Sequence, residues 1–320
     1  MNMKDKKIKK ILITGGAGFI GSSMAERLMQ DEENYVVIVD NLSTGHLGKI
    51  PSLEYRPRMW KFIKCDVNEY RDIAEIMLSY KFDYVFHYAA VVGVQRTQEN
   101  PVSVLRDIEG IKNVLNLSKN TGVKRIFFAS SSEIYGEPVE IPQNVYTTPL
   151  NSRLPYAIVK NVGEAFLRSY HKEYNLPYTI FRFFNTYGPK QSRDFVISKF
   201  VHKALKNEDL TIYGDGLQTR TFCYIDDNVE ACYKIFKENR LVNDVINIGG
   251  DTEISILELA KIVIEKTGSK SKIVHLPPLP DGDMKRRKPD NSPMLEILGR
   301  PLLTIEEGIE KTLEIGLFEK

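Results

Sequence analysis

The stretch ILITGGAGFIGSSMAERLM, residues 11–29, joins an apolar run to a helical pattern through closely spaced glycines. Gly15, Gly18 and Gly21 follow the apolar run directly, and MAERLM supplies the apolar face of the helix. Side chains at these glycines would obstruct the tight turn, the approach of backbone N–H groups to a pyrophosphate, and the close packing of helix on strand. The spacing therefore predicts a strand, a turn and a helix that bind a dinucleotide.

The next strand-like run ends in an acidic residue at the position that dinucleotide binding requires. YVVIVD ends in Asp40, about 20 residues further on, where a carboxylate can accept hydrogen bonds from both ribose hydroxyls of an adenosine. Asp40 would repel a 2′-phosphate and no arginine follows it immediately, which favours NAD over NADP. Asp66 and Val67, at the end of KFIKCDV, are expected to flank the adenine, although an acidic residue there is also ordinary for a loop.

Short β-branched runs alternate with helical patterns through the first half of the chain. The runs are KKILIT, YVVIVD, KFIKCD, DYVFHYAA, RIFFASS and PYTIFRFFNTYG, and between them apolar residues recur at three and four. Continuously apolar strands that alternate with helices indicate a parallel sheet covered on both faces. The predicted fold is α/β, a Rossmann-like doubly wound parallel sheet with a smaller α/β lobe.

The texture of the sequence changes after Gly188 and Pro189, with longer irregular stretches around helices such as SILELAKIVIEKTG. This change predicts a dinucleotide-binding domain over residues 1–185 and a substrate-binding lobe over 186–320. Residues 222–250 are expected to return to the first domain, because DVINIGG is typical of a core strand.

Composition argues against several other classes of protein. The 44 basic and 42 acidic side chains leave a formal charge of +2, so no overall field favours nucleic acid or an acidic membrane. No run approaches the roughly 18 apolar residues of a membrane span. The histidines show no metal-ligand spacing, and three cysteines without a CxxC pair favour a reducing compartment. We therefore expect a cytoplasmic protein that binds no nucleic acid, membrane or metal.

Two residues in LPYAIVKNVGEAFL are candidates for proton transfer. Tyr156 and Lys160 lie four residues apart, on one face of a predicted helix. A tyrosine with its ordinary pKa of about 10 is a poor base at neutral pH, and a neighbouring ammonium lowers that pKa by favouring the phenolate. The pair predicts a proton carrier, although the same spacing also occurs by chance on helix surfaces.

The segment FFASSSEIYGEP, upstream of Tyr156, is an apolar strand that ends in three hydroxyls and a glutamate. In a doubly wound sheet, ligands bind at the carboxyl ends of the strands. The segment is therefore expected to contribute to the same site as Tyr156 and Lys160.

These motifs stand together in a recognisable order. The order comprises the glycines of 15–21, Asp40-Asn41, HYAA at 87–90, SSSEIYG, PYAIVK, FNTYGP, YGDGLQTRTFCYIDD and RRKPD. With them the chain resembles the extended short-chain dehydrogenases/reductases of the NAD-dependent epimerase/dehydratase family, which modify nucleotide sugars. The resemblance covers nearly the whole chain and is specific for the superfamily, much less so for one member.

The resemblance implies a role for each residue of the expected site. Tyr156 would be the base, Lys160 would also hold the nicotinamide ribose, and Ser131, five residues before Gly136, would polarise the C4 oxygen of the sugar. Removal of the C4 hydroxyl proton, with hydride transfer to NAD, would give a 4-keto sugar. The residues implied in NAD binding are Gly15, Gly18, Phe19, Ile20, Gly21, Asp40, Asn41, Asp66, Val67, Ala89, Ala90, Tyr156 and Lys160.

Glu133 is the residue that best distinguishes the branches of this family. Similar 4-epimerases usually have a small residue there, whereas 4,6-dehydratases and UDP-glucuronate decarboxylases have glutamate. The pair Ser132-Glu133 looks more like the decarboxylases, or the GDP-mannose dehydratases, than like the dTDP-glucose dehydratases. Glu133 is therefore a fourth catalytic candidate and Ser132 a substrate-binding one, the alternative being that Glu133 only caps the loop.

The second half of the chain carries further substrate candidates. Arg220 and Arg287 match substrate-binding arginines of the decarboxylases, and arginine suits bidentate contact with a carboxylate or a phosphate. Arg220 is expected at the glucuronate carboxylate or nearby sugar, and Arg287 at the diphosphate. Asn185 and Tyr213 match residues near the diphosphate and the nucleobase, with a turn-forming asparagine and a buried aromatic as the alternatives.

Three departures from the decarboxylase pattern keep other reactions open. PYAIVKN is poorer in acidic and glycine residues than the usual decarboxylase segment. The loop VVGVQRTQENP looks closer to epimerases, with Arg96 where they often carry a basic residue near the substrate. Asp107 stands where relatives usually have an asparagine.

Decarboxylation of UDP-glucuronate to UDP-xylose is the first hypothesis, because oxidising C4 of a glucuronate creates a β-keto acid that loses carbon dioxide without a metal. A nucleotide-sugar 4-epimerase, and then a 4,6-dehydratase, are the alternatives. A non-enzymatic dinucleotide sensor is disfavoured, since Tyr156, Lys160 and Ser131 are all present. Relatives commonly pair two helices per subunit, which implies a homodimer.

Overall fold

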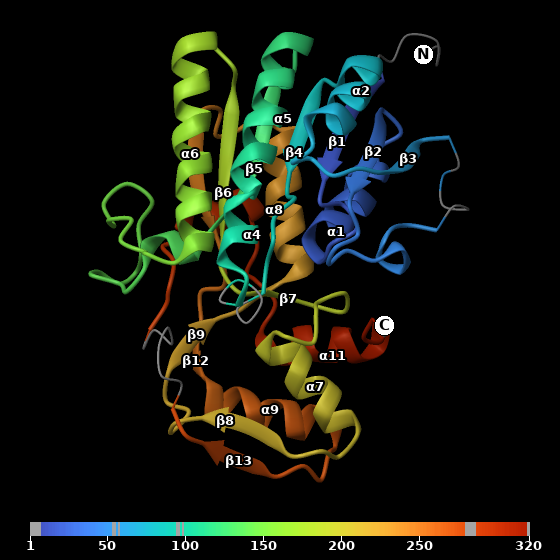
Figure 1. Ribbon diagram of the computed structural model, residues 1–320. Helices are drawn as coiled ribbons and strands as arrows, with labels where there is room; N and C mark the ends of the chain where they lie inside the picture. Colours follow the sequence, from blue (N-terminus) through green and yellow to red (C-terminus); the bar gives the residue numbers. More distant parts are fainter. Residues whose placement is uncertain are drawn as a thin grey trace. The chain divides into compact units, whose positions relative to one another are not determined.

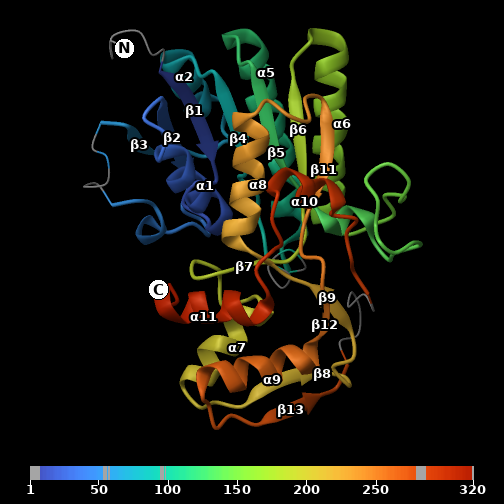
Figure 2. The ribbon, with the colours of Figure 1, turned by 180° about the vertical axis from the view of Figure 1, so that it is seen from behind.

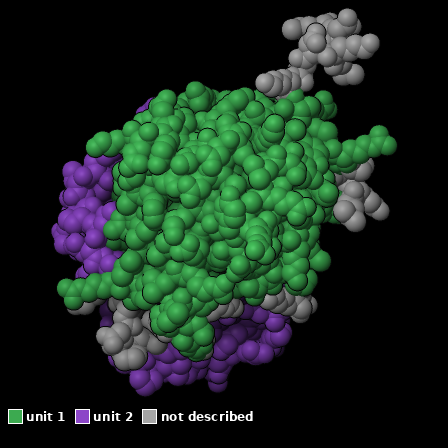
Figure 3. Space-filling view, turned by 45° about the horizontal axis from the view of Figure 1, so that its top comes forward, with its two compact units in different colours: residues 1–134, 153–182, 232–245 green, residues 135–152, 183–231, 246–320 purple. Residues whose placement is uncertain are grey.

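The structure is a computed structural model that describes residues 8–52, 56, 58–93, 97, 99–278 and 286–318. The chain divides into two compact units, which are distinguished by colour in Figure 3. The first unit consists of residues 1–134, 153–182 and 232–245, and the second of residues 135–152, 183–231 and 246–320. Residues 135–152 belong to the second unit although no sequence pattern marks them as different from their neighbours.

A parallel sheet forms the centre of the first unit, as the alternating pattern predicts (Figure 1). Its strand order is β11-β6-β5-β4-β1-β2-β3, and the pairings of β1 with β2 and β4, of β2 with β3, and of β4 with β5 are parallel. The strands are β1 (Lys9–Thr14), β2 (Asn34–Asp40), β3 (Trp60–Lys64), β4 (Tyr84–His87), β5 (Arg125–Ser131), β6 (Tyr178–Phe183) and β11 (Asp244–Ile248). The doubly wound α/β prediction is confirmed.

The strand order changes direction between β1 and β4, because β2 follows β1 on one side and β4 pairs with it on the other. In open α/β sheets, ligands bind at the carboxyl ends of the strands that flank such a point. The ends of β1, β2, β4 and β5 carry the residues that the sequence assigns to the cofactor and the chemistry.

Helices cover both faces of this sheet. Figure 1 shows α2 (Tyr70–Tyr80), α5 (Asp107–Thr121) and α6 (Pro155–Tyr174) on one face, with the short α4 (Pro101–Leu105) preceding α5. Figure 2 shows α1 (Phe19–Met29) and α8 (Ile225–Lys237) on the other face.

The central strands of the sheet are buried because they are apolar on both sides, whereas the edge strand β3 is partly exposed. Every residue of β5 is buried, and stacked rings link neighbouring strands: the ring centroids of Phe86 and Phe127 lie 4.4 Å apart, and those of Phe127 and Phe181 5.9 Å apart. Burial of such aromatic side chains dominates the stability of a core. The core therefore holds the strand ends, and the site on them, in place.

The second unit contains shorter strands and further helices. Its elements are β7 (Thr186–Tyr187), α7 (Val196–Leu205), β8 (Leu210–Tyr213), β9 (Thr219–Thr221), β10 (Cys223–Tyr224), β12 (Glu253–Ser255), α9 (Ile256–Thr267), β13 (Ile273–Leu276), α10 (Ser292–Leu298) and α11 (Ile305–Ile315). The strands pair as β10-β7, β12-β9 and β13-β8. Helix α9 begins with a capping box between Ser255 and Glu258, which satisfies backbone N–H groups at its first turn.

Candidate active site

The glycine turn joins β1 to α1 with no room for larger side chains. Gly15 has a φ of +68°, and a Cβ added there would lie 2.6 Å from the backbone nitrogen of Ala89. A Cβ on Gly21 would overlap the carbonyl group of Gly15. Helix α1 begins at Phe19, which is followed by Ile20 in its first turn. Its N-cap residue, Gly18, makes no side-chain cap hydrogen bond.

This geometry fits the pyrophosphate of a dinucleotide. The first turn of α1 contains no acidic residue, so its N–H groups and the positive end of the helix dipole meet no negative side chain there. The Cβ of an alanine would collide with the backbone of Ala89 at position 15 and with the backbone of Gly15 at position 21, so either substitution would force the turn to open.

Asp40 ends β2 beside the glycine turn and is held there by backbone donors. Its Oδ2 accepts a hydrogen bond from the Ala17 N–H at 3.0 Å, and its Oδ1 accepts one from the Leu42 N–H at 2.8 Å. Burial raises the pKa of the Asp40 carboxyl, and these two hydrogen bonds and the charge of Lys49 oppose the rise. The carboxylate is thus fixed at the strand end, as a partner of ribose hydroxyls must be.

The ends of β2 and β3 are joined by side chains that the sequence assigns to the adenosine region. Asn41 donates from Nδ2 to Oδ2 of Asp66 at 3.3 Å, and Asp66 accepts the Asn68 N–H through Oδ1 at 3.0 Å. Val67 is 8 % exposed and lies between them in the chain. Asp66 is therefore held both by its own loop and by the end of β2.

A buried pair at the ends of β1 and β4 places the predicted Ala89–Ala90 segment. Thr14 Oγ1 lies 2.8 Å from His87 Nδ1 and accepts the N–H groups of Tyr88 and Ala89, both at 3.2 Å. Burial, with the nearby charge of Lys160, lowers the pKa of His87 to about 3, so the imidazole is neutral. Because Thr14 Oγ1 already accepts two N–H groups, we assign its hydroxyl as the hydrogen-bond donor to Nδ1, and the threonine oxygen holds Ala89 beside the glycine turn.

The three predicted catalytic residues of β5 and α6 meet at one place. Ser131 is the last residue of β5, and its side chain is hydrogen-bonded to Tyr156 in the first turn of α6. Lys160, one turn further along α6, has its Nζ 5.7 Å from the Tyr156 ring centroid and 5.1 Å from that of Phe128. The chain thus brings a hydroxyl, a phenol and an ammonium together.

The electrostatics of this group differ from the simple expectation that Lys160 lowers the pKa of Tyr156. Burial raises the pKa of Tyr156 well above its usual value, the hydrogen bond with Ser131 opposes this, and the charges of Glu133 and Asp107 add to it. The expectation of a net lowering is wrong for the chain by itself, because desolvation disfavours the phenolate more strongly than neighbouring groups favour it.

Asp107, the first residue of α5, is the carboxylate whose charge acts on Lys160. Burial lowers the pKa of Lys160 to about 8, and the charge of Asp107 opposes that fall. Asp107 is 8 % exposed, and its Oδ2 accepts the Val91 N–H at 2.7 Å. Burial raises the pKa of Asp107, which the bond from Val91 and the charge of Lys160 oppose. Each group thus favours the charged form of the other.

Ser132 and Glu133 follow Ser131 in a short 3₁₀ turn, η2 (Ser132–Tyr135). Ser132 is buried and Glu133 half-buried, and the Glu133 N–H donates to Ser131 Oγ at 3.2 Å. The Glu133 charge acts on Tyr156. Glu133 therefore lies next to the catalytic group.

The other substrate candidates lie in the second unit. Asn185 precedes β7 and donates from Nδ2 to the Thr221 carbonyl at 3.0 Å. Tyr213 ends β8 and is 37 % exposed, so the alternative of a buried aromatic is wrong. Arg220, in β9, donates to the Thr219 carbonyl at 2.7 Å, and Arg287 is 6 % exposed. Arg96 lies outside the described residues.

Sequence reasoning missed residues that support this site from a distance. Thr14, His87, Ser130 and Glu164 were not singled out, and Asp107 was noted only as a departure from the family pattern. For Glu164 a signal was present, because it follows Tyr156 and Lys160 at the same spacing of four. Within the described ranges, no group of three or more metal-binding side chains occurs, and no helix is long and apolar enough to cross a membrane.

Known proteins with the same sequence pattern and fold were identified by comparison. The profile of the NAD dependent epimerase/dehydratase family matches residues 11–249. UDP-glucuronic acid decarboxylase 6 of Arabidopsis thaliana is 36% identical over 308 residues, which cover 94% of this chain and 86% of that protein. UDP-N-acetyl-alpha-D-glucosaminuronate decarboxylase of Bacillus cytotoxicus is 36% identical over 321 residues, covering 96% of this chain and 97% of that protein.

A solved structure agrees over the same length. UDP-glucose 4-epimerase of Thermotoga maritima, determined with UDP-glucose, superposes with a TM-score of 0.88 at 32% identity, covering 95% of this chain and 97% of that one. The match spans the glycine turn, Asp40 and the group around Tyr156, all of which lie within the profile of the family. The chain belongs to the NAD-dependent epimerase/dehydratase family and is an enzyme whose cofactor is NAD.

Proposed function

We propose that this enzyme decarboxylates UDP-glucuronate to UDP-xylose through transient oxidation at C4 of the sugar. The observation that carries the proposal is the similarity, over nearly the whole chain, to proteins named as decarboxylases of UDP-linked uronic acids. The residues of the site give further support, because Glu133, which the decarboxylases also have, lies beside Ser131 and its charge acts on Tyr156.

Each catalytic residue has a definite task in this reaction. When bound, NAD would supply the acceptor for the C4 hydride and the source of its return at the end of the cycle. Tyr156 takes the C4 hydroxyl proton, Ser131 donates to the C4 oxygen, and the Lys160 ammonium favours the phenolate. The ketone at C4 makes the C5 carboxylate that of a β-keto acid. The bond from C5 to the carboxylate breaks, carbon dioxide leaves, and the electron pair forms an enolate that is protonated at C5.

The residues of the second unit would bind the remaining parts of the substrate. We assign Arg220 to the glucuronate carboxylate or nearby sugar and Arg287 to the diphosphate, since guanidinium groups bind both anions bidentately. Asn185 is assigned to the diphosphate or adjacent sugar and Tyr213 to the nucleobase. Arg96 is kept as a candidate near the sugar, and Ser132 as a hydroxyl next to it.

Mass spectrometry of the products tests the proposal directly. The protein, supplied with NAD, is offered UDP-glucuronate, UDP-N-acetylglucosaminuronate, UDP-glucose, UDP-N-acetylglucosamine, GDP-mannose and dTDP-glucose separately. Loss of one carbon dioxide from UDP-glucuronate is the expected result. Loss of carbon dioxide from the N-acetylated uronate alone would mean that this sugar, and not UDP-glucuronate, is the substrate. Loss of water from any sugar would show that the enzyme is a dehydratase.

A 4-epimerase is the second candidate, favoured by the likeness to UDP-glucose 4-epimerase of Thermotoga maritima. Epimerisation uses the same oxidation at C4 and returns the hydride to the opposite face, so the mass is unchanged. NMR of the product would reveal inversion at C4, and absence of any inversion together with loss of carbon dioxide would exclude this candidate.

Replacing Asp107 by asparagine is expected to move the alkaline limb of the profile of kcat/KM against pH down by about one unit. Asparagine keeps an acceptor for the Val91 N–H but removes the charge that favours the Lys160 ammonium, whose pKa of about 8 then falls further. Activity at neutral pH changes less. The profile is measured from pH 6 to 10.

The matched control is Glu109→Gln, which removes a carboxylate from the same first turn of α5, where it pairs with exposed Lys112 at 3.0 Å. Its profile should coincide with that of the wild type. An unshifted alkaline limb in Asp107→Asn would mean that Asp107 does not act on Lys160.

Glu133→Ala is expected to leave reduction of NAD partly intact while blocking the later step, so that NADH accumulates on the enzyme. The physical reason is that Tyr156, Ser131 and Lys160 remain in place for oxidation at C4. Stopped-flow absorbance of NADH after mixing with substrate measures the first step, and product mass measures the second.

Glu137→Ala, an exposed carboxylate after the same segment, serves as the control and should retain both steps. Equal losses of both steps in Glu133→Ala would mean that Glu133 serves structure or binding alone.

We also propose that the enzyme is a cytoplasmic homodimer. The buried cysteines Cys65, Cys223 and Cys232 form no disulfide, which is consistent with a reducing compartment, and relatives in this family commonly pair through two helices of each subunit. Light scattering after size-exclusion chromatography measures the mass, and a monomer at micromolar concentration would exclude the dimer.

A further inference from the structure

We infer that Glu164 is a positioning residue, which fixes helix α6 against β5 and β6 so that the Tyr156 hydroxyl meets Ser131. The inference rests on the proposed function in that Tyr156 and Ser131 are taken as the groups that act at C4. The three residues Ser130, Glu164 and Arg182 are called the Glu164 cluster.

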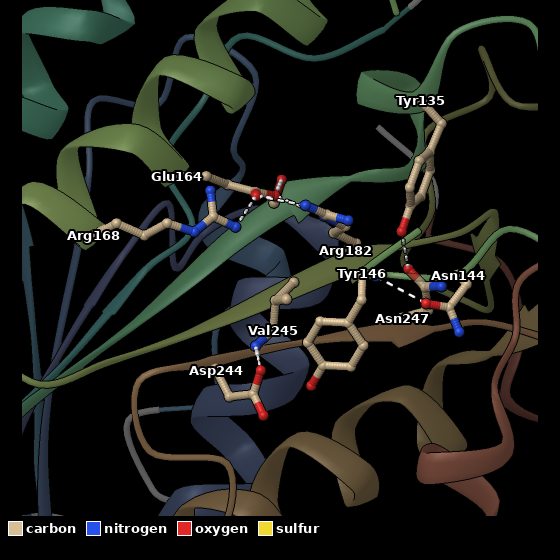
Figure 4. Close-up of polar contacts among 10 residues, drawn as sticks. Tyr135, Asn144, Tyr146, Glu164, Arg168, Arg182, Asp244, Val245 and Asn247 are labelled. Carbon is tan, nitrogen blue, oxygen red and sulfur yellow. Dashed lines mark hydrogen bonds and ion pairs between the residues drawn. The ribbon is translucent and has the colours of Figure 1, made fainter. Parts of the chain in front are cut away.

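The Glu164 cluster links three elements of the first unit through one carboxylate (Figure 4). Oε1 of Glu164 accepts the Ser130 hydroxyl at 2.7 Å and the Arg182 Nε at 2.9 Å, and Oε2 accepts the Arg182 Nη2 at 2.8 Å. Ser130 is in β5 and Arg182 in β6. Figure 4 shows Arg182 and Arg168, which belongs to α6 itself, reaching the carboxylate from opposite sides.

The contacts are those of a charged group that is held in one place. Glu164 is 0% exposed and Arg182 1% exposed. Burying a carboxylate is unfavourable unless it is paired and hydrogen-bonded, and a two-bond contact with a guanidinium restricts its geometry strongly. Burial raises the pKa of Glu164, but the hydrogen bonds from Arg182 and Ser130 and the charges of Arg182 and Arg168 bring it below its usual value, so the carboxylate stays ionised.

Spacing connects this cluster to the chemistry. Tyr156, Lys160 and Glu164 recur every four residues and lie on one face of α6. Ser130 directly precedes Ser131 in β5, so Glu164 holds the residue next to the one that Tyr156 contacts. The helix and the strand are therefore joined at two points about two turns apart, one structural and one catalytic.

Between these two points, helix α6 packs against β5 through a glycine, with no room for a larger side chain. Gly163 precedes Glu164, and a Cβ added to it would overlap the ring of Phe128 in β5. Helix α6 thus lies very close to the strand, and the Glu164 cluster sets its position along that strand. Misplacement of a reacting group by about 1 Å can lower a rate by as much as 100-fold.

Ser130→Ala is the decisive variant, because it removes the bond between the carboxylate and β5 and leaves the ion pair with Arg182. We expect kcat to fall about 10-fold on the nucleotide sugar that the wild type converts, with KM and bound NAD unchanged within twofold. The kcat of Glu164→Gln should be lower still. The inference would be overturned if KM rose together with the fall in kcat, or if the kcat of Ser130→Ala stayed within twofold of the wild type.

Arg168→Ala is the matched control. It removes a contact of 3.0 Å to the same carboxylate, and that contact lies within α6. Arg168 also interacts with Tyr178, at the start of β6 and thus at the opposite end of that strand from the catalytic group. The kcat of Arg168→Ala should equal that of the wild type. A fall equal to that of Ser130→Ala would mean that any loss around Glu164 acts through stability alone.

Crystal structures of the wild type and Ser130→Ala supply a readout that needs no substrate. The hydrogen bond between Ser131 and Tyr156 should lengthen or break in the variant, and an unchanged bond would overturn the inference. If the wild type converts none of the nucleotide sugars, the proposed function fails, and this comparison alone decides whether Glu164 positions Tyr156.

Discussion

Tyr156→Phe should lower kcat about 1000-fold while NAD still binds. Proton transfer by a positioned side chain contributes about 10² to 10⁴ in rate, and phenylalanine removes only the hydroxyl that is hydrogen-bonded to Ser131. The ring, which faces the Lys160 ammonium at 5.7 Å, remains. Product formation by mass spectrometry and NAD content by absorbance measure the two quantities separately.

The matched control is Tyr174→Phe at the other end of α6, where the side chain is 49% exposed. Its kcat should equal that of the wild type, since it lies outside the catalytic group. Full turnover in Tyr156→Phe would instead mean that Tyr156 is not the base, and the hypothesis that the chain is a dinucleotide sensor would have to be considered again.

Gly15→Ala should abolish retention of NAD on purification and weaken NAD binding at least about 100-fold. Two penalties combine at this position. An alanine at a φ of +68° is strained by about 1–2 kcal/mol, and its Cβ would lie 2.6 Å from the backbone nitrogen of Ala89. Backbone atoms cannot move aside as a flexible side chain does, so the glycine turn must open, and overpacking of this kind costs about 1–3 kcal/mol more.

Gly122→Ala separates the two penalties, because Gly122 has a φ of +79° and an added Cβ meets nothing within 4 Å. It should lose a similar 1–2 kcal/mol of stability from the backbone strain and bind NAD normally. Thermal unfolding and isothermal titration with NAD measure both variants. Normal NAD affinity in Gly15→Ala would contradict the account of the glycine turn.

The fold and the cofactor site were accessible from local patterns. The β5 run Arg125–Ser131 and the β1 run Lys9–Thr14 were predicted with the bounds that the structure has, because short apolar runs that alternate with helical patterns are typical of a parallel sheet covered on both faces. The turn at Gly15 was predicted because a tight strand-to-helix turn requires a residue without a side chain.

The chemistry was accessible only in part, since the residue types were identified but their interactions were not. Lys160 was expected to lower the pKa of Tyr156, and burial raises it instead. Asp107 was noted as a departure from the family pattern, and in the folded chain its charge acts on Lys160. Desolvation depends on all the atoms around a group, including distant segments, and spacing along the chain carries no record of them.

By itself, the sequence determined the doubly wound sheet, the NAD cofactor and the residue types of the catalytic group, because each of these depends on the order and spacing of patterns along the chain. The tertiary structure alone decided which carboxylate acts on the charge of Lys160 and which one bonds α6 to β5. Asp107 and Glu164 act through burial and through partners on other elements, such as Val91 and Arg182. Electrostatic energies inside a protein are set by that folded surrounding, where low polarity strengthens both the cost of burying a charge and the gain from pairing it.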